Sequence, residues 1–139
     1  MLKYNFYTED NICYCEIMYN DQKFVGSAKC HPDDLDMKSD RTGYFIAEVR
    51  ANIAKLRWCR DYEILPMVKY YKHFYDCVSH SSKFNPETYE AKMIKKELRR
   101  WESELALVRD TIQSEREYLR EYIDTKEKVY QRIRSVKHN

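Results

Sequence analysis

Three cysteines and one histidine in the amino-terminal part could together bind a metal. Cys13 and Cys15 are separated by one residue, and Cys30 is followed by His31. Thiolate and imidazole groups are the ligands that a tetrahedral zinc site uses. The chain has no Cys-x-x-Cys pair, however, and unpatterned cysteines most often fill apolar cores. We expect no metal and no other cofactor, with zinc on Cys13, Cys15, Cys30 and His31 as the alternative.

A second group of reactive side chains, His73, Cys77 and His80, falls at helical spacing. A metal pair or a Cys–His nucleophile would need an acid to orient the imidazole, and the neighbouring residues are Tyr and Lys. We interpret the group as surface histidines beside a core cysteine. A glycine-rich phosphate loop is excluded because the chain has only 2 Gly. The sequence therefore predicts a protein that is not an enzyme and has no catalytic residues.

Basic residues crowd both ends of the carboxyl-terminal third, where Glu97 and Glu127 are the acidic residues that oppose them. Basic helix faces with nearby tyrosines can bind phosphate backbones or acidic proteins. The alternative is the ordinary solvated flank of a coiled coil, which is rich in charge. The predicted partner-binding residues are Lys92, Lys95, Lys96, Arg99, Arg100, Arg132, Arg134 and Lys137.

One long amphipathic helix is expected to position these cations. Asn85 can cap it, Pro86 suits its first turn, and no Gly or Pro follows to residue 139. A heptad register places apolar residues at twelve of fourteen core positions, with Glu115 and Lys126 as the exceptions. The core positions are Ala91, Ile94, Leu98, Trp101, Leu105, Val108, Ile112, Glu115, Leu119, Tyr122, Lys126, Val129, Ile133 and Val136.

Two questions about this helix stay open in the sequence. A break near Gln113–Glu117, where polar residues become dense, would turn the helix into a hairpin. Polar residues at core positions either restrict register and partner number or indicate that the helix is solvated on that side. We favour the unbroken helix and the solvated side.

A small antiparallel sheet is expected before the helices. Residues 3–31 contain three runs of strand formers separated by turns at 9–11 and 20–22. With Asp21–Gln22 as a two-residue loop, Cys13 would face Cys30 and Tyr19 would face Phe24, on one apolar face. That face needs a helix to cover it, and helical spacing over 44–60 supplies one. Pro66 should end or kink this helix near Leu65.

The predicted fold class is therefore α+β. A three-stranded antiparallel sheet packs on a helix, and a long coiled-coil-like helix or helical hairpin follows. We expect a small α+β head with a kinked helical segment over residues 1–82 and a long amphipathic helical region over 86–139.

Composition limits the classes of partner and compartment. The formal net charge is +2, so no global field selects nucleic acid or membrane. We expect no secretory signal and no membrane span, because no apolar run has the required length. Five cysteines, an odd count, favour a reduced cytosolic protein.

Two segments resemble small accessory proteins of phages and prophages of Gram-positive bacteria. The resemblance lies in a strand with a CHPDD connector at 25–34 and an AEVRA-containing helix at 43–51. Some small phage proteins of this kind inhibit host defence, including CRISPR nucleases. The resemblance implies a phage-encoded anti-CRISPR type of inhibitor in the host cytoplasm, with a host protein as partner. Alternatives are a nucleic-acid-binding accessory protein, with a nucleic acid or nucleoprotein partner, and a coiled coil that forms a homodimer through its carboxyl-terminal helix.

Overall fold

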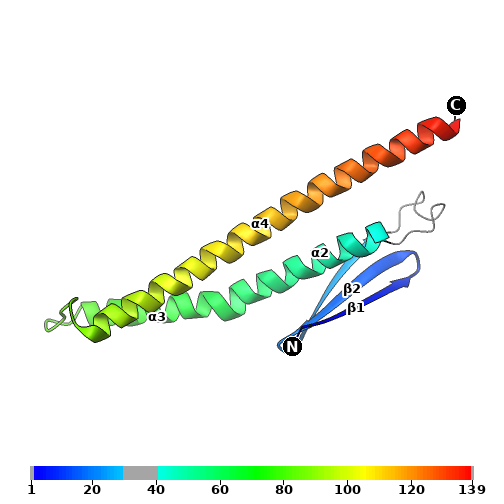
Figure 1. Cartoon of the computed structure of the whole chain (residues 1–139). Coiled ribbons are helices and arrows are strands. Elements are labelled where there is room, and N and C mark those ends of the chain that lie inside the picture. The colour runs from blue at the N-terminus through cyan, green and yellow to red at the C-terminus, as the bar shows by residue number, and fades with distance from the viewer. Residues whose placement is uncertain (1, 30–40, 139) are drawn as a thin grey trace. The chain divides into compact units, whose positions relative to one another are not determined.

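The computed structural model describes residues 2–29 and 41–138, with the side chains of residues 137 and 138 excepted. Its elements are three strands followed by helices, and Figure 1 labels most of them. This confirms the predicted α+β class. The chain forms two compact units, Met1–Lys55 with Ile112–Asn139 and Leu56–Thr111. The elements are β1 (Lys3–Glu9), β2 (Ile12–Tyr19), β3 (Gln22–Lys29), α2 (Arg41–Trp58), η1 (Cys59–Ile64), α3 (Leu65–Ser79) and α4 (Tyr89–His138).

The first unit begins with an antiparallel meander in the order β1-β2-β3. Asp10-Asn11 and Asn20-Asp21 form its two-residue turns, and all four residues have φ between 52° and 63°. Asn and Asp tolerate this left-handed conformation, which a type I′ hairpin turn requires at both central residues. Gln tolerates it less well, so the predicted Asp21–Gln22 loop is wrong.

The register of the second hairpin consequently differs from the prediction. Tyr19 pairs with Gln22 rather than with Phe24, and Cys13 pairs with Ala28 rather than with Cys30. Cys30 itself lies outside the described residues. The slip is by two residues, and side chains alternate with a period of two, so the same residues remain on the same face. The predicted composition of the apolar face is therefore confirmed although its pairing is not.

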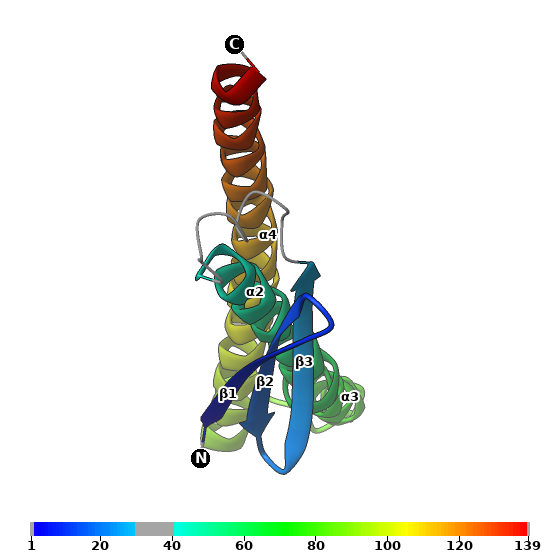
Figure 2. The ribbon, with the colours of Figure 1, turned by 90° about the vertical axis from the view of Figure 1, so that its right-hand side faces the viewer.

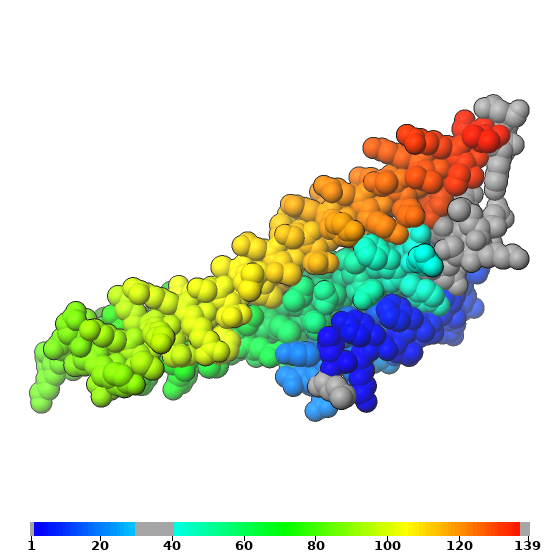
Figure 3. Space-filling model, viewed as in Figure 1, coloured from blue at the N-terminus to red at the C-terminus, as the bar shows by residue number. Residues whose placement is uncertain are grey.

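Helix α2 covers this face and approaches it closely. Cys13, Cys15 and Ile17 are fully buried, and Ala47 and Ala51 of α2 are buried as well. Figure 2 shows α2 lying across one side of the three strands, and Figure 3 shows its side chains closed against the sheet. Small residues permit the approach. A methyl group at Gly26 would lie 2.0 Å from the Ala47 carbonyl oxygen, and one at Gly43 would lie 2.5 Å from Cys13 Sγ.

The part of α4 that belongs to the first unit forms a third layer. The Phe45 ring of α2 lies 4.4 Å from the Tyr122 ring and 6.0 Å from the Tyr118 ring, measured between centroids. Figure 2 shows this part of α4 on the side of α2 that faces away from the strands. The first unit is therefore a sheet, a central helix and an outer helix.

The second unit contains a π-helical segment directly before Pro66. The α-helical pattern stops at Trp58, passes through the six π-helical residues of η1 and resumes at Leu65. Proline has no N–H to donate, and its ring needs space near the carbonyl of residue 62. The wider π turn relieves both problems. The helix predicted to end or kink near Leu65 therefore ends as an α-helix at Trp58, and the π-helical segment η1 leads directly into α3 at Leu65.

Helix α4 is one helix of 50 residues and not a hairpin. It begins at Tyr89 rather than at Pro86. Asn85 Oδ1 accepts the Glu87 N–H at 2.9 Å and closes a separate turn, whereas Thr88 Oγ1 accepts the Ala91 N–H at 3.3 Å and acts as the cap. The capping role predicted for Asn85 therefore belongs to Thr88.

The buried side of α4 follows the predicted heptad only in part. Five of its six buried apolar residues are predicted core positions, but the sixth is Tyr130. Val129 and Val136, two predicted core residues, are 41% and 76% exposed. A helix with 3.6 residues per turn drifts by about 20° per heptad from a strict seven-residue repeat. Tyr130 lies five such turns beyond the buried Ile112, whereas Val129 and Val136 have rotated away by about 100° or more.

Candidate functional site

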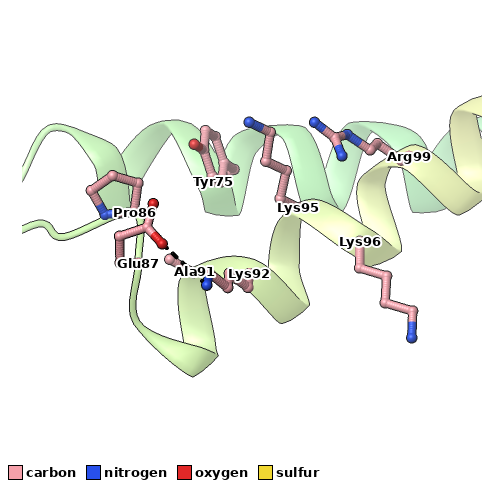
Figure 4. Close-up of a pocket in the computed structure, with 8 residues that line it drawn as sticks. All are labelled: Tyr75, Pro86, Glu87, Ala91, Lys92, Lys95, Lys96 and Arg99. Carbon is pink, nitrogen blue, oxygen red and sulfur yellow. Dashed lines mark ion pairs between the residues drawn. The ribbon is translucent and has the colours of Figure 1, made fainter.

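A hollow of about 370 Å³ in the second unit gathers most of the first predicted basic cluster. It is lined by Tyr75 of α3, by Pro86 and Glu87 of the turn that precedes α4, and by residues of α4 itself (Figure 4). We call it the basic hollow. The residues that α4 contributes are Ala91, Lys92, Lys95, Lys96 and Arg99.

Local helix geometry positions these cations. Lys95 and Lys96 each stand three or four residues from both Lys92 and Arg99, which places the four cations on neighbouring positions along one side of α4. The Thr88 cap fixes where that helix begins, and the buried Ala91 anchors its first turn. The four side chains therefore share a strip of one rigid element, which holds a constellation better than a loop does.

The charges around the hollow are only partly neutralised. Lys92 Nζ pairs with Glu87 at 3.1 Å, and both side chains are exposed. In the part of the chain that the structure describes, Lys95, Lys96 and Arg99 have no acidic side chain within ion-pair distance. Figure 4 shows Lys95 and Arg99 extending on the side of Tyr75, whereas Lys96 extends away from it. Like charges at this spacing repel one another, and a bound anion would relieve that repulsion.

The remaining predicted cations do not line the hollow. Arg100 pairs with Glu97 at 3.5 Å and lies over the Trp101 ring, 5.2 Å from its centroid. Arg132 and Arg134 are exposed on the part of α4 that belongs to the first unit. The side chain of Lys137 lies outside those that the structure describes.

The amino-terminal cysteines occupy the core. Cys13 and Cys15 are fully buried under α2. The pKa of the Cys15 thiol is raised to about 11, mainly by burial and in addition by the negative charges of the nearby Glu48 and Glu16. Such a thiol is a poor nucleophile and a poor metal ligand at neutral pH. Cys30 and His31, the other two residues of the zinc alternative, lie outside the described part of the chain.

No metal-binding cluster is present within residues 2–29 and 41–138, where no three His, Cys, Asp or Glu side chains lie close enough together. The His73–Cys77 pair does come together on α3, with 3.5 Å between Nε2 and Sγ. Cys77 is exposed, however, so the interpretation of a core cysteine beside surface histidines is wrong for the cysteine. Helical spacing alone does not tell which side of a helix is covered.

Sequence reasoning missed the contribution of α3 to the site. Tyr75 enters the wall of the basic hollow, and its ring lies 5.9 Å from the Phe84 ring, edge to face. One residue earlier, Phe74 is exposed and its ring lies parallel to that of the exposed Tyr70, 6.2 Å away. The sequence feature that could have indicated this contribution of α3 is the aromatic and basic run at 69–75, KYYKHFY.

A second hollow of about 280 Å³ lies within the first unit and was also missed. Glu48 and Glu115 both line it, from α2 and α4 respectively. The rings of Tyr4, Phe45 and Tyr118 form part of its wall. The sequence feature that points to it is Glu115, one of the two polar residues at predicted core positions.

Comparison with known proteins gives no match: the chain fits no protein-family model, and no curated protein or solved structure shows significant similarity to it. None of the helices in the described residues is both long and apolar enough to cross a membrane.

Proposed function

We propose that this chain is a non-enzymatic, phage-encoded binding protein that inhibits or modulates a host defence or nucleic-acid-processing protein such as a CRISPR–Cas nuclease. The basic hollow is the surface that contacts the anionic component of this partner. The observation that supports the proposal is that Lys95, Lys96 and Arg99, around one hollow, have no acidic partner among the residues that the structure describes.

The chemistry of the hollow favours an anionic group. The positive charges of Lys95, Lys96 and Arg99 repel one another, so an incoming phosphate or carboxylate lowers the electrostatic energy of the site. Arg99 can hold two oxygens at once through its planar guanidinium, and lysines add point charges. Exposed cations also accelerate association with an anionic surface.

The resemblance to phage accessory proteins supports a host protein as the target. Nucleases and other nucleic-acid-processing proteins work in complexes that contain phosphate backbones, and such a complex offers the anionic component that the hollow requires. No catalytic step of its own is part of this function.

Affinity capture from a Gram-positive host lysate tests the proposal. The tagged chain should retain a nucleic-acid-processing protein and lower its nuclease activity. The K95E/R99E variant should lose both effects, because it reverses the charge of the hollow. The matched control is R116E/R120E, which makes the same change of charge at two exposed arginines of the first unit. Equal retention of the partner by both variants would refute the role of the hollow.

Self-association is a second candidate function, favoured by the exposed apolar residues near the end of α4. Val129 and Val136 are exposed and lie seven residues apart, so they share one helix strip. A second copy of the helix would cover this strip. Mass measurement over a range of protein concentrations tests it, and a monomer at every concentration would exclude it.

A further inference from the structure

Strand β1 is an open edge of the sheet in the first unit. The order β1-β2-β3 leaves one side of β1 without a partner strand in the part of the chain that the structure describes, and Figure 2 shows β1 at that edge. Hydrogen-bonded and non-bonded pairs alternate along antiparallel strands, and a two-residue turn closes on a bonded pair. Counted from the turn at 10–11, the backbone N–H and C=O groups of Tyr4, Phe6 and Thr8 therefore point away from β2.

The opposite edge of the sheet, β3, is protected against pairing with another chain. By the same alternation the Ser27 carbonyl points outwards, and Arg50 of α2 donates a hydrogen bond to it at 2.7 Å. The exposed Lys23 and Lys29 also lie on this strand, and lysines on an edge oppose further strand addition. Strand β1 lacks such protection, because it contains no Pro, pairs with β2 without a bulge and carries charges only at its two ends.

The residues of β1 are complementary to a second copy of the same strand that runs in the opposite direction. In a register centred on Phe6, Lys3 lies opposite Glu9 of the second copy, and Tyr4 lies opposite Thr8. Tyr4, Phe6 and Thr8 are the residues whose backbone groups point outwards, so this register makes them hydrogen-bonded pairs. A register displaced in either direction pairs fewer of the seven residues and separates the two charges.

The side chains at this edge have the exposure and the charge that the register requires. Tyr4 and Phe6 are 46% and 42% exposed, so a second strand would cover apolar surface that α2 leaves open. Lys3 and Glu9 are exposed, and within the described residues neither of them takes part in an ion pair. Opposite charges directly across two strands attract each other.

We propose that β1 pairs with β1 of a second copy of this chain, antiparallel about Phe6, and joins two three-stranded sheets into one sheet of six strands. This surface is separate from the exposed valines near the end of α4, and it goes beyond the proposed function of the basic hollow. In such a symmetric interface every cross-strand pair except the central one occurs twice, so one substitution changes two contacts.

Sedimentation analysis of the full chain from about 1 μM to about 1 mM tests the proposal, and the wild type should show a monomer–dimer equilibrium. One opposite-charge pair across two strands raises the association constant by about 1.4-fold to fivefold, and a like-charge pair lowers it similarly. Lys3→Glu replaces two attractions by two repulsions, so the dissociation constant should rise at least about fourfold. The matched control is K29E, which makes the same change of charge at an exposed lysine of β3 and should dimerise as the wild type does.

Exchange of the charges tests the register itself. E9K should weaken association as K3E does, whereas the double variant K3E/E9K restores opposite charges at both pairs and should regain the affinity of the wild type. An equal mixture of K3E and E9K should form a mixed dimer more tightly than either variant associates alone, because two acidic positions then face two basic ones. Both positions are exposed, so the substitutions should leave the fold intact, which circular dichroism checks.

Three outcomes would overturn the inference. One is a monomer at every concentration up to about 1 mM. Another is a dimer that K3E weakens but K3E/E9K does not restore, because the two charges would then not lie opposite each other. The third is a dimer that V129E/V136E abolishes and K3E leaves unchanged, which would assign self-association to α4.

Discussion

Replacement of Gly26 by alanine should disrupt the contact between the sheet and α2. Gly26 lies on β3 under α2, where an added methyl carbon would be 2.0 Å from the Ala47 carbonyl oxygen and 2.4 Å from the Ala51 nitrogen. Both neighbours are backbone atoms, which cannot rotate away as a side chain can. A Cβ atom essentially never comes within 3.0 Å of a heavy atom outside its own residue and that residue's two chain neighbours, so α2 must move by about 1 Å.

The expected loss of stability follows from two opposing effects. Overpacking of a close-packed core costs about 1–3 kcal/mol, and a displaced backbone belongs at the upper end of that range. Alanine in a strand is intrinsically favoured over glycine by about 0.5–1 kcal/mol. The free energy of unfolding should therefore fall by about 2 kcal/mol, which corresponds to a decrease in Tm of about 8 °C for a chain of this size.

Thermal and urea unfolding, followed by circular dichroism, measure this loss. Ser27→Ala is the matched control, because the neighbouring side chain points to the opposite face of the sheet and is exposed. Its backbone carbonyl, which accepts a hydrogen bond from Arg50 at 2.7 Å, is unchanged by the substitution. The control should lie within about 0.5 kcal/mol of the wild type. If Gly26→Ala is as stable as the control, α2 does not lie against β3 as described.

Three further predictions test the helix phase, the outer sheet face and the thiols. Tyr130→Ala should lower the free energy of unfolding by about 3 kcal/mol and Val129→Ala by less than about 1 kcal/mol, because Tyr130 is buried and Val129 is exposed. Urea unfolding measures both losses. Equal losses would contradict the placement of Tyr130, rather than Val129, on the buried side of α4. The pKa of Glu16 is held below its ordinary value, first by its lysine partner and then by Tyr and Asn hydrogen bonds, so this stabilisation is present above about pH 4.3 and is lost as pH falls through the folded-state pKa. Thermal melts from neutral pH to about pH 3 should therefore show a smaller acid-induced loss for E16Q than for the wild type, and parallel curves would speak against it. A thiol reagent at neutral pH should modify the exposed Cys77 before the buried Cys15, whose pKa is about 11; peptide mass mapping that finds equal rates would exclude this burial.

The strands and their faces could be predicted because they depend on residues that are close together in the sequence. Alternating residue types place Cys13, Cys15 and Ile17 on one face whatever the exact pairing, since a slip by two residues keeps the face. The pairing depends instead on which two residues accept a left-handed backbone, and three adjacent polar residues at 20–22 left that choice open. The close packing of α2 on the sheet could not be predicted from the sequence, because it depends on glycines and alanines of separate elements that meet only in the folded chain.

The candidate site was predicted in part for the same reason. Helical spacing places Lys92, Lys95, Lys96 and Arg99 on one side of α4, which requires only local geometry. The contribution of Tyr75 depends on how α3 lies against α4 within the second unit, which no local pattern specifies.

Glu115 shows how a deviation from a pattern can locate a structural feature. A carboxylate at a core position must either be paired or reach water, because an unpaired buried charge is very costly. Glu115 is half-buried, and it lines the second hollow together with Glu48. The volume of about 280 Å³ is ample for water molecules. The helix is therefore accessible to solvent at this point, as favoured from the sequence, and the polar residue marks where the packing of α2 against α4 opens. The same reasoning separates Glu115 from Val129: the first is a polar residue where the packing opens, and the second is an apolar residue that the helical twist has carried away from the core.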